Sequence, residues 1–182
     1  MVKRRAYHRQ QLACPGVLSV LVLPAEWRLH LSFMPSLRLG SRGRGGLPCV
    51  CRALAADALE DGRMLVLLAE RAAPRVVTAL RETGQAALLA NSPRTNRTLH
   101  LKGRDARVEP GLPEHAGLLA LRRATMGAEI AEIDGFADAP FLQLWYGAAE
   151  QGLAAVYFSV SGAWDQTPGP NAGQPVALES VS

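Results

Sequence analysis

The stretch from Met64 to Ala90 decides the fold, and it reads MLVLLA-ERAA-PRVVTALRET-G-QAALLA. Its first six residues form a continuous apolar run of the kind that a buried β-strand shows. A helix is expected over Pro74–Thr83, because proline suits the first helical position, apolar residues recur at helical spacing and Gly84 can end the helix. An apolar strand follows over Gln85–Ala90. The stretch therefore predicts one short helix between two strands.

Strand patterns continue on both sides of this stretch. The glycine-rich turn Ser41–Gly46 separates two strand candidates, and the turn at Glu60–Gly62 leads into the apolar run, so two consecutive hairpins are expected. Consecutive hairpins favour an antiparallel meander or barrel. The expected strands are Ser36–Leu39, Pro48–Asp57, Met64–Ala69, Gln85–Ala90, Arg97–Glu109 and Leu153–Ser161.

The region between the fifth and sixth strands is expected to be helical. One helix runs from Leu118 toward Met126, and a second short helix is expected around Ala128–Ile133, after Gly127. A third, Pro140–Gly147, carries three aromatic residues at helical spacing that we expect to pack against the sheet: Phe141, Trp145 and Tyr146.

Four pieces of sequence in this order resemble the pyridoxamine 5'-phosphate oxidase-like split barrels. They are an Arg after a Pro on the second strand (Pro48-Cys-Val-Cys-Arg52), a Gly-led apolar strand (Gly62 to Leu68), the short helix, and a strand that reads Arg97-Thr-Leu-His-Leu-Lys-Gly103. The resemblance covers about the middle third of the chain. It implies a mainly β fold with flanking helices, a six-stranded antiparallel split β-barrel that binds FMN.

The resemblance also implies the positions of the cofactor contacts. Arg52 would lie near the phosphate and ribityl chain of FMN, where its planar guanidinium can donate two charge-assisted hydrogen bonds. Thr98 replaces a glutamine that contacts the flavin in the family. The implied contact residues are Arg52, Ala53, Leu54, Leu67, Leu68, Arg75, Arg97 and Thr98. Ala53, Leu54, Leu67 and Leu68 would contribute backbone groups, and Arg75 would reach the phosphate from the helix start.

The chain departs from the family pattern at several points. The basic pair that follows the third strand of the oxidase is missing from Ala69-Glu-Arg71, and the residues that hold pyridoxamine phosphate have no counterpart after Leu112. The resemblance is therefore to an uncharacterised branch and not to the vitamin B6 oxidase itself. The expected function is that of a flavin-dependent oxidoreductase acting on an unknown small molecule. The alternatives are a non-catalytic flavin-binding or sensing protein, and a related barrel that binds haem, with His100 as a candidate, or a deazaflavin.

A homodimer with the flavin at the subunit interface is also expected. The family places its flavin between subunits, and a small barrel with an aromatic cluster at 141–146 exposes more apolar surface than one core needs. The expected organisation is an N-terminal extension over residues 1–30 that need not be ordered, a barrel domain over 31–165 and a Pro/Gly-rich tail over 166–182.

The distribution of charge and cysteine limits the partners and the compartment. The net charge of +4 lies within the first thirty residues, since residues 31–182 hold equal numbers of basic and acidic groups, so a nucleic-acid-binding surface is not expected. The apolar run Val17–Leu23 is too short to span a membrane, and an extension is favoured over a signal peptide. Cys14, Cys49 and Cys51 fit a reducing cytoplasm and suggest no zinc site.

Overall fold

The computed structural model describes residues 20–135 and 139–181, and their fold is mainly β. One antiparallel sheet has the strand order β3-β2-β6-β7-β8-β5-β4, and the short β9 (Gln174–Pro175) pairs with β8. The strands of this path are β2 (Ser36–Arg42), β3 (Pro48–Ala53), β4 (Ala55–Ala58), β5 (Arg63–Ala69), β6 (Ala86–Asn91), β7 (Thr98–Pro110) and β8 (Leu153–Asp165). Five of the six strands expected from the sequence are present as single strands, whereas the expected strand Pro48–Asp57 is divided at Leu54 into β3 and β4.

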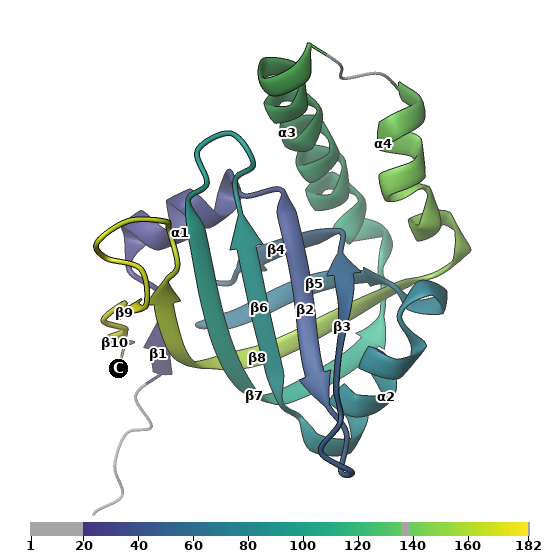
Figure 1. Ribbon diagram of the computed structural model, residues 1–182. Helices are drawn as coiled ribbons and strands as arrows, with labels where there is room; N and C mark the ends of the chain where they lie inside the picture. Colours follow the sequence, from purple (N-terminus) through teal and green to yellow (C-terminus); the bar gives the residue numbers. More distant parts are fainter. Residues whose placement is uncertain (1–19, 136–138, 182) are drawn as a thin grey trace, which may run out of the picture.

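The sheet curls into a barrel because its two edge strands, β3 and β4, are consecutive in the sequence. Only Leu54 separates β3 from β4, although these strands stand at opposite ends of the strand order, and its N–H donates to the carbonyl of Leu67 at 2.8 Å. The two longest strands, β7 and β8, bend across the molecule (Figure 1), and their register shifts between Lys102 and Gly103 and again between Arg104 and Arg107. Such shifts mark bulges, which bend a strand and increase its twist. The split-barrel expectation is confirmed.

The inside of the curled sheet is filled by apolar side chains. Leu37, Leu39, Leu88 and Leu99 are fully buried there together with Phe158. The Phe158 ring lies so close to Gly103 that a Cβ at that position would overlap it. The final glycine of the strand that carries the family resemblance therefore has a packing role in this chain.

Helix α2 (Pro74–Thr83) has the bounds that the sequence predicts. Its four buried residues include Val76, Val77 and Leu80, and Gly84 ends the helix in the left-handed conformation with φ 63°. Left-handed backbone is available to glycine without steric cost, which explains the stop. The helix packs against β2, β3 and β7 at one end of the barrel (Figure 1).

Two helices lie between β7 and β8. The sequence predicts a break after Gly127, but the structure has one continuous helix, α3 (Ala116–Asp134), so that prediction was wrong. Gly127 is buried, and a Cβ there would stand 3.1 Å from a methyl of Leu142 on α4 (Ala139–Tyr146). The glycine thus serves close helix packing rather than termination. Short 3-10 turns flank the pair: η2 (Pro113–His115) and η3 (Gly147–Gln151), while η1 (Glu70–Ala72) precedes α2.

Arg122 ties α3 to the barrel. Only 1% of this residue is exposed, and its guanidinium donates to the carbonyls of Leu31, Ser32 and Ala56. Burial lowers the pKa of Arg122 from its usual value, while Asp57 opposes that shift. The carbonyls of Leu31 and Ser32 lie at the end of α1. The Leu31 carbonyl also accepts from the Met34 N–H at 3.1 Å, and Arg122 adds a donor to this helix end.

The chain before Leu31 contributes to the fold. Helix α1 (Ala25–Ser32) buries Trp27 in the main core, and β1 (Val20–Val22) pairs with β10 (Glu179–Val181). Residues 1–19 lie outside the described residues. Residues 20–30 do not behave as a separate extension, because Leu23 and Trp27 belong to the same core as the barrel. The expected tail also returns to the fold, since Val176 and Leu178 pack on that core.

No helix in the described ranges is long and apolar enough to cross a bilayer.

Candidate functional site

A row of outward side chains crosses five strands of the barrel. The register places Arg52 of β3 beside Arg38 of β2, then Leu89 of β6, His100 of β7 and Trp164 of β8. Residues one step along these strands point inward, as alternation requires, and those that are buried include Leu37, Ala53, Leu88, Leu99 and Ala163. Arg52 and Trp164, which are 112 positions apart in the sequence, therefore lie on one outer face.

The neighbouring row makes this face concave. It runs Val50, Gly40, Ala87, Lys102 and Gly162, so three of its five positions carry a methyl group or no side chain. A groove of about 550 Å³ results, and six of its lining residues are Arg38, Gly40, Leu89, Thr98, His100 and Gln166. Small residues here let a flat ligand approach the backbone closely.

Two arginines stand at one end of the groove. The Arg52 guanidinium carbon lies 3.4 Å from the centre of the Trp145 ring on α4, and Arg38 is directly opposite on β2. Within residues 20–135 and 139–181, neither arginine forms an ion pair with a carboxylate. Burial, and then the charge of Arg38, lower the pKa of Arg52 from its usual value, while Tyr146 opposes the shift.

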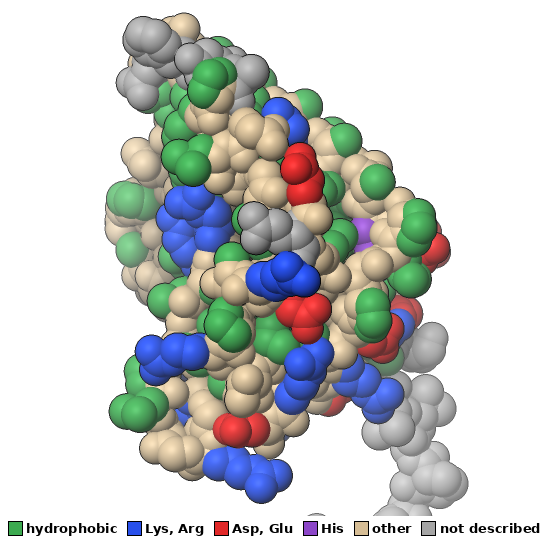
Figure 2. Space-filling view, turned by 90° about the vertical axis from the view of Figure 1, so that its right-hand side faces the viewer, with side chains coloured by type: hydrophobic (Ala, Val, Ile, Leu, Met, Phe, Trp, Pro, Cys, Tyr) green, Lys and Arg blue, Asp and Glu red, His purple; other side chains and the backbone are tan. Residues whose placement is uncertain are grey.

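The flank that carries α2 has a different balance of charge. Basic and acidic side chains are interspersed there (Figure 2), and the Arg81–Glu70 pair at 3.2 Å is an example from this part of the chain. Like charges directly opposite on neighbouring strands are destabilising. The unpaired Arg38–Arg52 arrangement is therefore costly without an anion, and it is suited to bind one.

His100 and Trp164 form the other side of the groove. Their ring centroids are 5.7 Å apart, and the Lys102 ammonium lies 5.1 Å from the centre of the Trp164 ring. Burial, and then the charge of Lys102, lower the pKa of His100 from its usual value, which favours the neutral imidazole. A neutral imidazole can both donate and accept a hydrogen bond or bind a metal ion.

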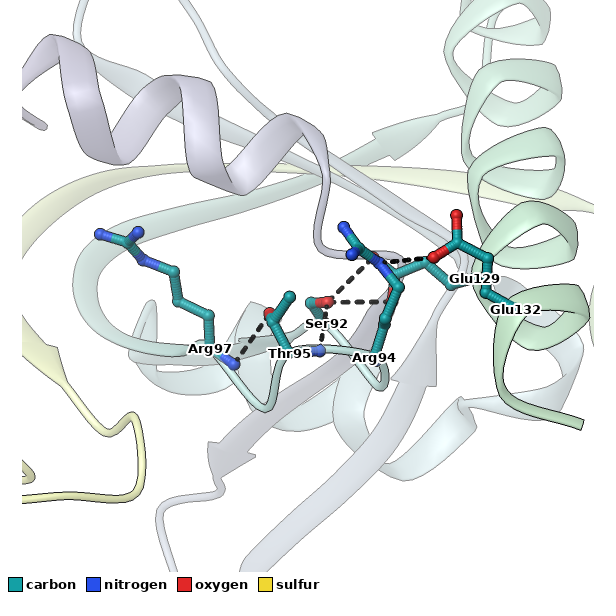
Figure 3. A network of polar contacts seen from close by, with 6 residues as sticks. All are labelled: Ser92, Arg94, Thr95, Arg97, Glu129 and Glu132. Atoms are coloured by element: carbon teal, nitrogen blue, oxygen red, sulfur yellow. Dashed lines mark hydrogen bonds and ion pairs between the residues drawn. The ribbon is translucent and has the colours of Figure 1, made fainter.

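The loop before β7 is fixed by a polar network on α3 (Figure 3). The Ser92 hydroxyl donates to the buried carboxylate of Glu129 at 2.9 Å, and the Arg94 N–H donates to the same carboxylate at 3.2 Å. Arg94 also pairs with Glu132 at 3.2 Å. Thr98, which follows this loop, accepts a hydrogen bond from the Asn91 amide at 2.7 Å. The network therefore fixes one end of the groove.

The structure brings two of the expected cofactor contacts to the groove. Arg52 lies on the outer face and Thr98 lines the groove. Ala53, Leu54, Leu67 and Leu68 are buried, and the Leu54 N–H donates to the Leu67 carbonyl, so that donor is not available to a ligand. The proposal that these four residues contact the flavin gains no support from the groove.

Arg75 and Arg97 lie apart from the groove. Arg97 pairs with Glu26 at 2.8 Å and lies 5.1 Å from the centre of the Trp27 ring, so it is occupied by α1. Arg75 is exposed at the start of α2, beside a smaller cavity of about 330 Å³ that Cys49 also lines. Burial, and then Cys49, raise the pKa of Cys51 to about 11, which argues against a reactive thiol at that position.

Sequence reasoning missed Arg38, Gly40, Val50 and Leu89 as parts of the site. Folding the first hairpin about residues 43–47 would have placed Arg38 opposite Arg52, because each arginine is four residues from the last pair, Arg42 and Pro48. Leu89 of β6 and His100 of β7 could not be placed beside Arg38 in this way. The register of β6 against β2 depends on the helix between β5 and β6.

The fold can be compared with known proteins. No protein-family model matches the sequence, and no curated protein matches it either. Solved structures do resemble it, among them HupZ from Group A Streptococcus, with 9% identity, a TM-score of 0.49 and coverage of 84% of this chain and 100% of that one. The chain has the split-barrel fold.

Two further split barrels show the range of these neighbours. A pyridoxamine 5'-phosphate oxidase-related, FMN-binding protein from Nostoc punctiforme has 14% identity and a TM-score of 0.45, with 86% of this chain and 94% of that chain covered. HutZ, the haem storage protein from Vibrio cholerae, has 17% identity and a TM-score of 0.47, with 79% and 94% covered. At such identities the likeness concerns the fold alone.

Proposed function

We propose that this split barrel binds FMN on its outer face and uses it as a flavin-dependent oxidoreductase acting on a small molecule. The observation that carries the proposal is the cross-strand pair Arg38–Arg52, which has no acidic partner within the described ranges. The pair stands beside a groove whose base is formed by small residues such as Gly40 and Ala87. A dianionic phosphate would relieve the repulsion between the two guanidinium groups.

The residues around the groove suit the rest of FMN. Gly40 and Ala87 leave room for a flat ring, while the hydroxyl, imidazole and amide groups of Thr98, His100 and Gln166 can hydrogen-bond to its edge. Bound FMN supplies hydride and electron transfer, and the protein positions it and adjusts its electronics. This division of roles requires no acid–base dyad in the chain.

Arg52→Ala is expected to weaken FMN binding by roughly tenfold to a hundredfold, because a charge-assisted contact contributes about 1.5–3 kcal/mol. Arg52→Lys should recover only part of the affinity, since an ammonium group cannot reproduce the bidentate fork. Flavin fluorescence titration measures both. Arg107→Ala is the matched control, because Arg107 is an exposed arginine of β7 that does not line the groove. Equal affinity of wild type and Arg52→Ala would remove Arg52 from the site.

A homodimer through the outer face is part of the proposal. Val50 projects from this face with 68% of its surface exposed, and Leu89 is exposed on the same face. The aromatic cluster supports the interface less than expected, because Tyr146 is buried and Trp145 lies against Arg52. A second copy would cover the exposed apolar groups and enclose the flavin, so that dimerisation and binding are linked.

Val50→Lys is expected to convert the dimer to a monomer and to weaken flavin binding at the same time. The added cation cannot repel a phosphate, so any loss of flavin would come from the lost interface. Light scattering and flavin titration on the same sample test this. Leu144→Lys is the control, because Leu144 is 86% exposed on α4, away from the groove. A monomeric wild-type protein that is saturated with flavin would contradict the dimer.

One observation favours haem as a second candidate. His100 lines the groove, and burial lowers the pKa of its imidazole, which favours the neutral form that an axial ligand needs. The absorbance spectrum of the purified protein, with the mass of the released cofactor, distinguishes FMN, deazaflavin and haem. Reduction by NADPH and reoxidation in air would then separate an enzyme from a passive flavin carrier or sensor. We place the protein in a reducing cytoplasm, in which Cys49 and Cys51 stay free thiols.

A further inference from the structure

A second cavity, of about 760 Å³, adjoins the groove on the side of Gly40 and Ala87, away from Thr98. It lies where β2, the turn after α2 and the middle of β7 meet, and it shares Gly40 and Ala87 with the groove. Three cations line it: Arg42, Lys102 and Arg104. Among the described residues that line it there is no aspartate or glutamate. We call it the basic pocket.

The three cations are not neutralised by acidic side chains. Arg42 donates from Nε to the Gln85 side-chain oxygen at 2.9 Å, and Lys102 contacts the Trp164 ring. In the part of the chain that the structure describes, none of the three cations forms an ion pair. Asp105, the nearest acid in sequence to Arg104, is already bound to the N–H and the hydroxyl of Ser159. The positive charge of the basic pocket is therefore available to a ligand.

The basic pocket is separate from the Arg38–Arg52 pair. Arg42 is four residues beyond Arg38 on β2, which corresponds to about 13 Å along an extended strand. If FMN phosphate occupies the arginine pair, the basic pocket remains for a second anion next to the ring.

We infer that the basic pocket binds the anionic end of the molecule that reacts at the groove, a substrate that carries a phosphate ester or several carboxylates. This inference rests on the proposed function, because it takes the flavin to lie between the two cationic ends. Ser41 and Ser161 add hydroxyl groups at the pocket, and both now donate to backbone carbonyls, of Gln85 and Lys102 respectively. A ligand oxygen can take over such hydrogen bonds.

Calorimetric titration of the purified chain with pyrophosphate and, separately, with citrate tests the inference at fixed ionic strength. Saturable binding is expected, and the triple substitution Arg42→Gln, Lys102→Gln, Arg104→Gln should weaken it by about tenfold or more. Tighter binding of pyrophosphate would identify phosphate as the preferred group, and tighter binding of citrate would identify carboxylate. Thermal unfolding of the variant establishes that it is folded.

A matched triple, Arg28→Gln, Arg71→Gln, Arg107→Gln, removes the same charge outside the basic pocket. It should leave anion binding within about twofold of wild type, because long-range effects of exposed charges are screened. Equal losses in both triples, or no saturable binding, would overturn the inference. So would loss of flavin in the basic-pocket triple, which would make the pocket the FMN phosphate site. Anion binding at the pocket by a protein that binds no flavin would instead refute the proposed function alone.

Discussion

Arg122→Met is expected to lower the free energy of unfolding by about 3 kcal/mol. The substitution keeps an unbranched stem but removes the guanidinium, so the carbonyls of Ser32 and Ala56 lose this donor while Leu31 keeps the Met34 N–H. Each buried unsatisfied acceptor costs roughly 1–3 kcal/mol. The full sum is not expected, because the folded state no longer has to bury a charge. Chemical denaturation followed by tryptophan fluorescence measures the change.

The neighbouring arginine provides the control for this substitution. Arg123 makes one long contact, 3.5 Å from its Nη2 to the Gln143 side chain, so Arg123→Met should change the stability by less than about 0.5 kcal/mol. If the two variants were equally stable, the guanidinium of Arg122 would not be what holds α1 and β4 to α3.

Trp27→Ala is expected to destabilise the fold by about 3–5 kcal/mol, the range for a large aromatic side chain removed from a core. Trp27 is 9% exposed, belongs to the main core and is covered by the Arg97 guanidinium. Denaturant midpoints with unchanged slopes would show that the loss is one of stability.

Leu29→Ala is the control on the same helix, because Leu29 is 60% exposed and its removal should cost less than about 0.5 kcal/mol. The pair of variants also tests the domain boundary. A dispensable segment over residues 1–30 would make both substitutions equally mild, whereas a cooperative unit that includes α1 separates them.

The strands and α2 could be predicted because their signals are local. Pro74 and Gly84 fix the ends of α2 by backbone geometry alone, and the turns at 43–46 and 61–62 fix two hairpins. Gly127 misled the prediction of α3 because its small size serves the approach of α4, a tertiary reason that the local sequence does not show. Helix α1 was missed although Trp27 and Leu31 stand four residues apart, since basic residues surround them.

The site was only partly predictable for a related reason. Arg52 and Thr98 were named from motifs, but their neighbours Arg38 and His100 join them through strand register. Register across β2–β6 depends on how the segment between β3 and β6 folds, and no pattern within either strand specifies it. The basic pocket likewise combines residues 42, 102 and 104, which the chain separates by about a third of its length.

The position of β8 has a consequence for how the chain reaches this state. This strand stands between β5 and β7 in the sheet, yet it is the last of the long strands along the chain. Until residues 153–165 have left the ribosome, β5 and β7 each lack a partner on one side, and the barrel cannot close. Folding must then await contacts of large sequence separation, which slows it and leaves strand edges open to other chains. Synthesis rate and chaperone access therefore matter more for this barrel than for a protein of its size built from local contacts.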